Sequence, residues 1–314
     1  MYKVAVLGHQ EITKVFVNTL IQESEVELIL GASLDHSSAS ANDFVDMAPI
    51  YNSLNCSHIY LDDYSLRCTD LDIQLEAHGV EIVLVVGWSR LIPEDLIKKY
   101  TFIGWHGGAY PPPRCRGRAG VNWALINRHR IFYYYTMLLD SGVDSGKILS
   151  INDMNIDVYD TARTIYLKLG FNLVDLFISA LPKLNQDPDI DLADIDPTLL
   201  PGRKPEHGLI NWYQSDFDVD LFVRALSTPY PNSFSMLRDD NKVTIKSGRP
   251  LGCIPKLNLK PGEIYQDLAW GGFIVGCSSG NYLVEEYSID KITGFLHGEC
   301  FVESIGVLNP TIKY

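Results

Sequence analysis

The sequence predicts an α/β fold in which a doubly wound, mostly parallel sheet is followed by a smaller C-terminal β-barrel. Short β-branched strands alternate with helical apolar spacing in the first half of the chain, as in a parallel sheet covered by helices. A stretch rich in Asp and Pro then precedes short strands separated by Gly, Pro and Asn turns, which is typical of small β-barrels and sandwiches. The 314 residues, 46% of them hydrophobic, suit one large or two ordinary domains. We therefore expect a first domain over 1–186, a linker over 187–205 and a second domain over 206–314.

In the first domain, each predicted strand is a short apolar run, and each predicted helix has apolar residues at helical spacing. The predicted strands are Lys3–Leu7, Val26–Ala32, His58–Leu61, Glu81–Val86, Ile131–Leu139 and Ile148–Ile156. The predicted helices are Glu11–Gln22, Leu71–His78, Val121–Ile126 and Asp160–Leu184. The run Glu81–Val86 is almost continuously apolar, as in a parallel strand covered on both faces, and Pro93 fits the first turn of a following helix.

The second domain begins with a short predicted helix over Asp218–Leu226, which Pro229 and Pro231 end. Only short strands follow it. They are predicted at Val243–Lys246, Gly262–Ile264, Gly272–Val275 and Tyr282–Tyr287. This spacing indicates a small antiparallel barrel or sandwich.

Composition and charge exclude several classes of protein. The net charge of -13 argues against a broad nucleic-acid footprint. We find no signal peptide and no apolar run long enough to cross a bilayer, so we expect a cytoplasmic protein without membrane insertion. The six cysteines form no C-x-x-C pair, so neither a zinc site nor a disulfide framework is indicated.

The most informative stretch runs from Thr101 to Gly146. His106 leaves a strand into a loop rich in glycine and proline, and Asp144 lies on a second glycine-rich turn. In doubly wound sheets, ligands bind beyond the carboxyl ends of the strands, so the loops at Gly8, Gly87–Ile92 and Trp105–Gly117 are expected at one edge. A neutral imidazole can accept a proton near pH 7, and a carboxylate can orient it. The alternatives are a histidine satisfied at a strand end and an ordinary Asp turn.

Several motifs in a fixed order resemble the N10-formyltetrahydrofolate-dependent formyltransferases. The resemblance is strongest to the sugar N-formyltransferases, including the formyltransferase part of the bifunctional enzyme that formylates UDP-4-amino-4-deoxy-L-arabinose for lipopolysaccharide. The motifs are His106, Pro111 to Gly117, Arg116-Gly117-Arg118-Ala119 with Asn122-Trp123, Asp140 to Gly146, Gly202-Arg203-Lys204-Pro205, Ile210-Asn211-Trp212, Val223-Arg224-Ala225, Pro229-Tyr230-Pro231 and Phe234-Ser235. The resemblance covers nearly the whole chain and implies a formyltransferase catalytic domain followed by an OB-like domain.

The resemblance also implies roles for individual residues. His106 and Asp144 are expected to be catalytic, and no metal is expected. The residues expected to bind the formyl donor, N10-formyltetrahydrofolate, are Gly87, Trp88, Arg90, Leu91, Ile92 and Asp140. The residues expected to bind the acceptor, a nucleotide-linked amino sugar, are Tyr110, Arg114, Arg116 and Arg118. Guanidinium groups suit a diphosphate, although 87–92 also reads as a plain βα loop and the arginines as solvated surface residues.

One position departs from the family pattern. Where the family has the asparagine of Asn-x-His, this chain has Gly104, which has no side chain to donate to an oxyanion. Losing such a donor typically lowers the rate on the order of 10²–10³-fold. Either another group takes its place, such as the His106 imidazolium, a backbone N–H of Gly107 or Gly108, or a water, or the protein is slow or a non-catalytic relative that binds folate or a nucleotide. Methionyl-tRNA formylation is a separate rival function. The resemblance also leaves a homodimer open.

Overall fold

The structure is a computed structural model that describes residues 1–36, 44–67, 70–114, 116–186, 199–237, 241–265, 268–290 and 298–302. The chain forms two compact units. Unit 1 comprises Met1–Val121, Arg130–Asp157 and Thr164–Pro201, and unit 2 comprises Asn122–His129, Val158–Arg163 and Gly202–Tyr314.

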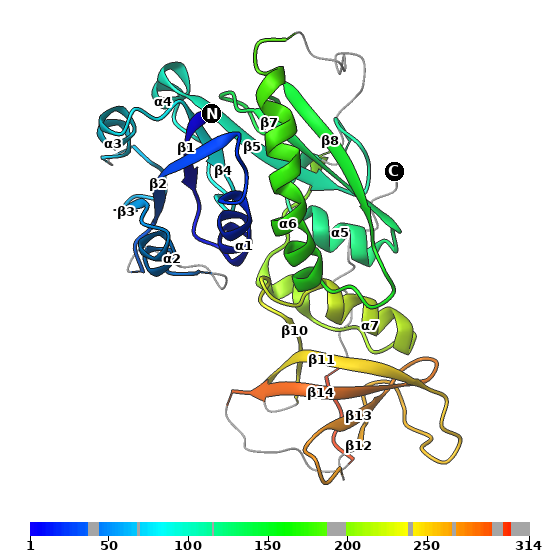
Figure 1. The fold of residues 1–314 in the computed structure, drawn as a ribbon. Helices are drawn as coiled ribbons and strands as arrows, with labels where there is room; N and C mark the ends of the chain where they lie inside the picture. Colours follow the sequence, from blue (N-terminus) through cyan, green and yellow to red (C-terminus); the bar gives the residue numbers. More distant parts are fainter. Residues whose placement is uncertain are drawn as a thin grey trace. The chain divides into compact units, whose positions relative to one another are not determined.

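Unit 1 is built around a seven-stranded sheet with the strand order β3-β2-β1-β4-β5-β7-β8 (Figure 1). Its strands are β1 (Tyr2–Leu7), β2 (Val26–Leu34), β3 (Ser57–Leu61), β4 (Ile82–Val85), β5 (Thr101–Gly108), β7 (Ile131–Leu138) and β8 (Ile148–Asn155). The pairs from β3 to β5 are parallel, whereas β5–β7 and β7–β8 are antiparallel. The first strands therefore end at a common edge, as the sequence pattern predicted.

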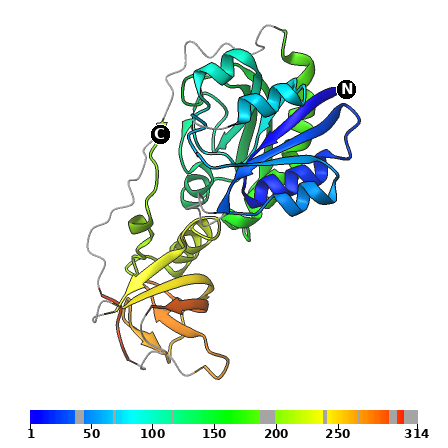
Figure 2. The ribbon, with the colours of Figure 1, turned by 90° about the vertical axis from the view of Figure 1, so that its left-hand side faces the viewer.

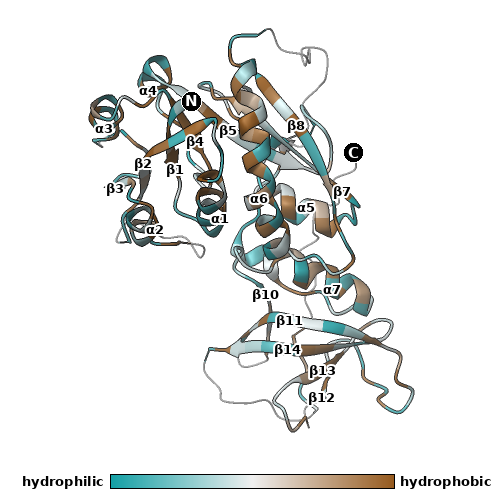
Figure 3. Ribbon diagram, in the orientation of Figure 1, coloured by the Kyte–Doolittle hydropathy of each residue, from teal (hydrophilic) through white to brown (hydrophobic). Residues whose placement is uncertain are grey.

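The central strands are apolar because both of their faces are covered. All four residues of β4 are buried, and both β4 and β1 are coloured toward the hydrophobic end of the scale in Figure 3. One face packs against α3 (Leu71–Ala77) and α4 (Glu94–Lys99), where Leu75 and Leu96 join Ala5 and Leu7 in one apolar cluster. Figure 2 shows the blue and cyan helices around these strands, including the short α2 (Ala48–Ser53).

The helices α1 (Glu11–Leu20) and α6 (Ala162–Ala180) pack against each other. The rings of Phe16 and Phe177 meet edge to face with centroids 5.2 Å apart. Gly170 lets the helices approach closely, because a Cβ there would lie 2.8 Å from Val15 Cβ. Among the described residues, the helical segment Ala162–Lys183 alone is long and apolar enough to cross a membrane, and about half of it is buried inside the protein. The burial of Leu169, Leu173 and Phe177 fits a core helix.

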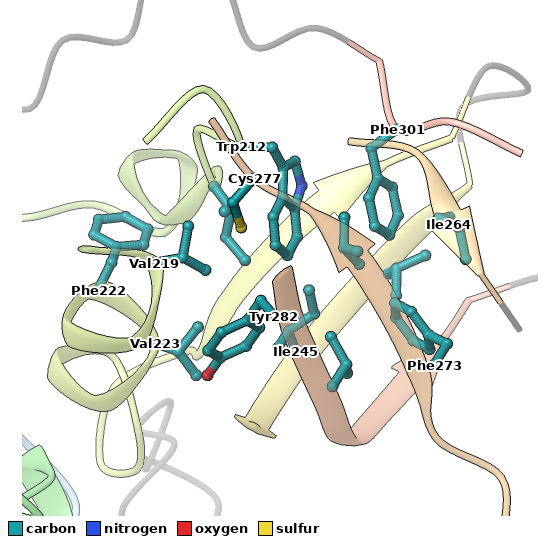
Figure 4. Packing of buried hydrophobic residues seen from close by; sticks show 14 of the residues in the cluster. Trp212, Val219, Phe222, Val223, Ile245, Ile264, Phe273, Cys277, Tyr282 and Phe301 are labelled. Carbon is teal, nitrogen blue, oxygen red and sulfur yellow. The ribbon is translucent and has the colours of Figure 1, made fainter. Parts of the chain in front are cut away.

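Unit 2 contains α7 (Asp216–Ala225) and a five-stranded antiparallel sheet with the order β10-β11-β14-β13-β12. Its strands are β10 (Ser233–Met236), β11 (Lys242–Gly252), β12 (Ile264–Tyr265), β13 (Phe273–Gly276) and β14 (Asn281–Ile289). Figure 4 shows the core, in which Trp212 and Tyr282 pack among apolar side chains. The indole Nε1–H of Trp212 donates to the Ser235 hydroxyl at 2.8 Å, which satisfies its one buried donor.

The smaller elements are α5 (Gly120–Ile126), the 3₁₀ turns Leu181–Lys183 and Pro205–Gly208, and the short strands β6 (Arg116–Gly117) and β9 (Leu199–Leu200). Strands β6 and β9 pair in parallel. The chain therefore returns after α6 to the arginine-containing loop of unit 1. The predicted linker over 187–205 thus contains a short strand at its described end, and its residues 187–198 lie outside the described part of the chain.

The predicted fold class is confirmed: a mostly parallel sheet with helices precedes an antiparallel, barrel-like sheet. Strand β5 runs through His106 to Gly108, further than the sequence indicated, because His106 pairs with Tyr135 in the β5–β7 ladder. Helix α6 ends at Ala180, and a 3₁₀ turn containing Pro182 takes its place. Pro93 is the residue that precedes α4 and caps it.

Candidate functional site

His106 lies near the carboxyl end of β5 in the middle of the sheet. Its register partner on β7 is Tyr135, whose ring meets the imidazole edge to face with centroids 5.8 Å apart. The side chain of His106 keeps 16% of its surface exposed. The imidazole is therefore held by the sheet on one side and reachable from solvent on the other, which a group that exchanges protons with a ligand requires.

Asp144 reaches the same place from the turn between β7 and β8. Its Oδ2 lies 3.7 Å from His106 Nδ1 and accepts a hydrogen bond from the Gly117 N–H at 3.1 Å. The 3.7 Å separation is longer than a hydrogen bond. The structure thus brings together His106 and Asp144, which are distant in sequence, and it ties the loop that contains Arg116 to the same carboxylate.

Gly104 is buried two residues before His106, and the space beside it is filled. A Cβ at Gly104 would lie 2.7 Å from Leu139 Cδ2. The place of the family asparagine is therefore occupied by a leucine side chain, which has no donor for an oxyanion.

The segment 87–92 follows β4 at the same edge of the sheet. Gly87 has φ +75°, and a Cβ there would lie 2.4 Å from Thr13 Oγ1. The side chains of Trp88 and Ile92 are buried in the core, whereas Arg90 and Leu91 are exposed. A ligand at this segment would thus meet backbone groups together with the Arg90 and Leu91 side chains.

Hydrogen bonds hold the segment 87–92 in place from the side of Tyr64. The hydroxyl groups of Tyr64 and Ser89 are 2.6 Å apart, and the Ser89 N–H donates to the Tyr64 hydroxyl at 3.3 Å. Arg90 lies over the Tyr64 ring, with its guanidinium carbon 5.2 Å from the ring centroid. The roles predicted for Gly87, Trp88, Arg90, Leu91 and Ile92 stay predictions.

Sequence reasoning missed His9, which follows β1 at this edge. Its ring is fully buried and contacts Tyr64 and Trp88 edge to face, with both centroid distances 5.4 Å. Neither ring nitrogen has a hydrogen-bond partner in the described part of the chain. Burial lowers the pKa of His9 to about 4, so the ring is neutral at pH 7. The sequence did contain a signal: the histidine directly follows Gly8, and the loop at Gly8 was one of those expected at this edge.

The arginines expected to bind the acceptor differ in exposure. Arg114 and Arg118 are exposed, whereas Arg116 is half-buried on β6 beside Gly117. The Arg116 Nε atom is buried and has no hydrogen-bond partner among the described residues. Tyr110 is half-buried. Arg116 and Arg118 flank Gly117, whose N–H contacts Asp144, and the acceptor roles of all four residues stay predictions.

The two side chains that the structure brings together here, His106 and Asp144, are an imidazole and a carboxylate. The described residues include no cluster of three His, Cys, Asp or Glu side chains able to hold a metal ion. Cys56, Cys253, Cys277 and Cys300 are free thiols, and burial raises the pKa of the Cys277 thiol to about 12. Cys68 and Cys115 lie outside the described residues. An imidazole beside a carboxylate, open to solvent on one side, is suited to accepting a proton from an attacking nucleophile.

Comparison with known proteins identifies the family. The formyl transferase profile matches residues 3–181, and the profile of the formyl transferase C-terminal domain matches residues 203–293. The chain belongs to the formyl transferase family. This formyltransferase family uses N10-formyltetrahydrofolate as its formyl donor, so the donor expected from the sequence is the donor of the family.

Two curated relatives with different names align with this chain. A methionyl-tRNA formyltransferase of Thermodesulfovibrio yellowstonii is 30% identical over 212 residues, 66% of this chain and 65% of that protein. The bifunctional polymyxin resistance protein ArnA of Wigglesworthia glossinidia brevipalpis is 29% identical over 191 residues, 58% of this chain and 29% of that protein. This chain thus spans slightly less than two thirds of the first relative.

Solved structures share the fold at low identity. HypX from Aquifex aeolicus superposes with a TM-score of 0.65 at 17% identity, covering 91% of this chain and 45% of its own. A sugar N-formyltransferase from Shewanella sp FDAARGOS_354 superposes with a TM-score of 0.58 at 19% identity, covering 80% of this chain and 99% of its own. Both similarities concern the fold.

Proposed function

We propose that this formyltransferase transfers the formyl group of N10-formyltetrahydrofolate to the amine of a nucleotide-linked amino sugar. The observation that carries the proposal is the pairing of His106 and Asp144 at the carboxyl edge of the sheet, with His106 Nδ1 3.7 Å from Asp144 Oδ2. A cytoplasmic location and a homodimer remain predictions that accompany this proposal.

In the proposed reaction, His106 accepts a proton from the acceptor amine as the nitrogen attacks the formyl carbon. A new C–N bond forms, the bond between the formyl carbon and N10 breaks, and the proton passes from His106 to N10, which releases tetrahydrofolate. Asp144 favours the protonated imidazole while it carries this proton, because an opposite charge nearby stabilises the charged form. General-base assistance of this kind typically contributes about 10²–10⁴-fold to a rate.

The choice of a sugar nucleotide rests on charge. The net charge of -13 disfavours a large polyanion such as tRNA, whose binding depends on many basic contacts. A diphosphate needs only a small local set of guanidinium groups, and the short segment with Arg114, Arg116 and Arg118 provides one. The half-buried Arg116 supports this choice, because its buried Nε has no hydrogen-bond partner among the described residues and such a donor suits an anionic ligand.

Methionyl-tRNA formylation is the second candidate. It is favoured by the name of the curated relative that aligns over 66% of this chain. The third candidate is a non-catalytic relative, favoured by Leu139 beside Gly104, where a formyl oxyanion would find no side-chain donor.

One assay separates the three candidates. The protein is incubated with N10-formyltetrahydrofolate and either a panel of UDP- and dTDP-linked amino sugars or charged initiator tRNA, and products are detected by mass spectrometry. We expect a formylated sugar nucleotide. Formylation of the tRNA alone would favour the second candidate, and binding of folate or nucleotide without product would favour the third.

The catalytic assignment has its own control. We expect His106→Asn to lower kcat by at least about 100-fold while binding of the sugar nucleotide is retained. The matched control is His78→Asn, at the C-cap of α3, which should leave kcat unchanged. Full activity of His106→Asn would contradict the role of His106 as general base.

A further inference from the structure

The carboxylate of Asp140 accepts hydrogen bonds from within the turn that contains Asp144. Asp140 Oδ1 accepts a hydrogen bond from the Gly142 N–H at 3.0 Å and from the Ser145 hydroxyl at 2.7 Å. Gly142 packs closely against that hydroxyl, since a Cβ at Gly142 would lie 2.0 Å from Ser145 Oγ. One carboxylate oxygen thus joins the start of the turn to the residue directly after Asp144.

The backbone of Asp144, in the same turn, is in the left-handed region. Its φ is +48°, which residues other than glycine seldom adopt, although Asp tolerates it better than most. The same residue places Oδ2 3.7 Å from His106 Nδ1 and 3.1 Å from the Gly117 N. A turn that relaxed toward negative φ would swing this carboxylate away from both partners.

We propose that Asp140, together with Ser145, is a positioning residue that holds Asp144 against His106. The proposal rests on the proposed function, in which His106 is the general base. It gives Asp140 an indirect role, in place of the direct contact with the formyl donor predicted from the sequence. Ser145 has no role assigned from sequence, and it becomes the second member of the same hydrogen-bonded turn.

The first test compares variants within this turn. Asp140→Ala removes the acceptor and should lower kcat about 10- to 100-fold, while KM for N10-formyltetrahydrofolate changes less than about twofold. Ser145→Ala removes one of the two bonds and should lower kcat about 3- to 10-fold. Asp140→Asn keeps an acceptor oxygen and should stay within about threefold of the wild type.

Ser141→Ala is the matched control, because Ser141 is exposed in the same turn and makes no hydrogen bond among the described residues. It removes the same group as Ser145→Ala and should leave kcat unchanged. A raised KM or Kd for the donor with unchanged kcat in Asp140→Ala would instead assign Asp140 to the donor contact and overturn the proposal.

A double-mutant cycle tests whether Asp140 acts through Asp144. In the Asp144→Asn background, Asp140→Ala should lower the remaining activity less than about twofold, because the carboxylate that it positions is already gone. An equal loss in both backgrounds would show that the two residues act independently, which overturns the proposal.

A spectroscopic test needs no turnover and so separates this proposal from the proposed function. In protein labelled with ¹⁵N-histidine, the ring signals of His106 are assigned by their absence in His106→Asn. Asp140→Ala should move these signals in the direction that Asp144→Asn moves them, whereas Asp140→Asn should leave them in place. Unmoved signals in Asp140→Ala would refute the positioning role, and absence of turnover in the wild type would refute only the proposed function.

Discussion

The imidazole of His9 packs against both Tyr64 and Trp88, which also contact each other, and its ring centroid lies 6.2 Å from that of Phe44. Desolvation lowers the pKa of His9 from 6.5 to about 4, since neither nitrogen has a described partner that would stabilise the charged ring. Between these two pH values His9 is protonated in the unfolded chain and neutral in the folded chain. Stability is therefore highest above pH 6.5 and falls as the pH drops toward 4.

Replacing His9 should remove this part of the pH dependence. The pKa of His9 in the folded chain is about 4 against 6.5 unfolded, which corresponds to about 3 kcal/mol of unfolding free energy lost over that range. We expect His9→Phe, which keeps an aromatic ring, to flatten the fall measured by urea unfolding at a series of pH values. His78→Gln serves as the control and should keep the wild-type slope. A slope in His9→Phe as steep as in the wild type would contradict the assignment.

At Gly104, where the chain departs from the family pattern, a neighbouring side chain fills the space beside the glycine. An added Cβ would meet Leu139 Cδ2 at 2.7 Å, and the Leu139 N–H is fixed by a hydrogen bond to the Phe102 carbonyl at 2.9 Å. The leucine and the glycine therefore form a matched pair. An asparagine at position 104 would require the Leu139 side chain to move, because the atoms that an added Cβ would meet all belong to that side chain.

At the scale of elements, α1 and α6 pack through a close approach at Gly170. A Cβ at Gly170 would lie 2.8 Å from both Cβ and Cγ1 of Val15. The Val15 Cβ is fixed to the helix backbone, so a change of rotamer cannot relieve this contact. Glycine inside a helix normally costs about 1 kcal/mol relative to alanine, and here the close packing offsets that loss.

We expect Gly170→Ala to destabilise the protein by about 1–3 kcal/mol, because the overpacking exceeds the gain in helix propensity. Adding Val15→Ala should recover part of the loss by opening the contact. Urea unfolding of the two single variants and the double variant measures this coupling. Strictly additive effects would show that the two side chains do not compete for the same space.

The elements that the sequence could predict are those whose signal is local. Strand β4 and helix α7 were recognisable from an apolar run and from helical spacing, and the N-cap Ser215, which accepts from the Asp218 N–H at 3.1 Å, fits such local rules. The end of β5 could not be predicted, because the pairing of Gly107 and Gly108 with β7 extends it beyond His106.

In the candidate site, too, the sequence predicted the features with a local signal and missed those that depend on contacts between distant segments. The strand end before His106 and the glycine-rich turn of Asp144 predicted the edge of the sheet at which the two meet. The filled space beside Gly104 and the unpaired ring of His9 depend on side-chain packing between segments far apart in sequence. No local pattern carries that information.

At the scale of the whole molecule, the two compact units have separate cores and different chemistry. The residues expected to hold the donor, from Gly87 to Ile92, belong to unit 1, and so does the turn that contains Asp140 and Asp144. Unit 2 has its own apolar core around Trp212 and Tyr282. Occupation of the donor site should therefore stabilise segments of unit 1 directly.

Hydrogen exchange with and without folinic acid, a stable analogue of the donor, tests this expectation. Peptides that contain 87–92 and 140–146 should exchange more slowly with the ligand, whereas peptides from β11 and β14 should exchange at unchanged rates. The same experiment on a protein with Arg90→Ala and Leu91→Ala should show weaker protection. Protection confined to β11 and β14 would place the folate site in unit 2 and contradict the predicted donor residues.

The positive φ of Asp144 has a consequence for how this protein can change over time. Glycine would relieve the backbone strain at this position but would also remove the carboxylate beside His106. The substitution that strains the backbone least is therefore one that abolishes the acid–base pair. Selection for stability alone would favour a descendant that keeps the fold but lacks activity. An aspartate retained at this position would then record continued selection for turnover.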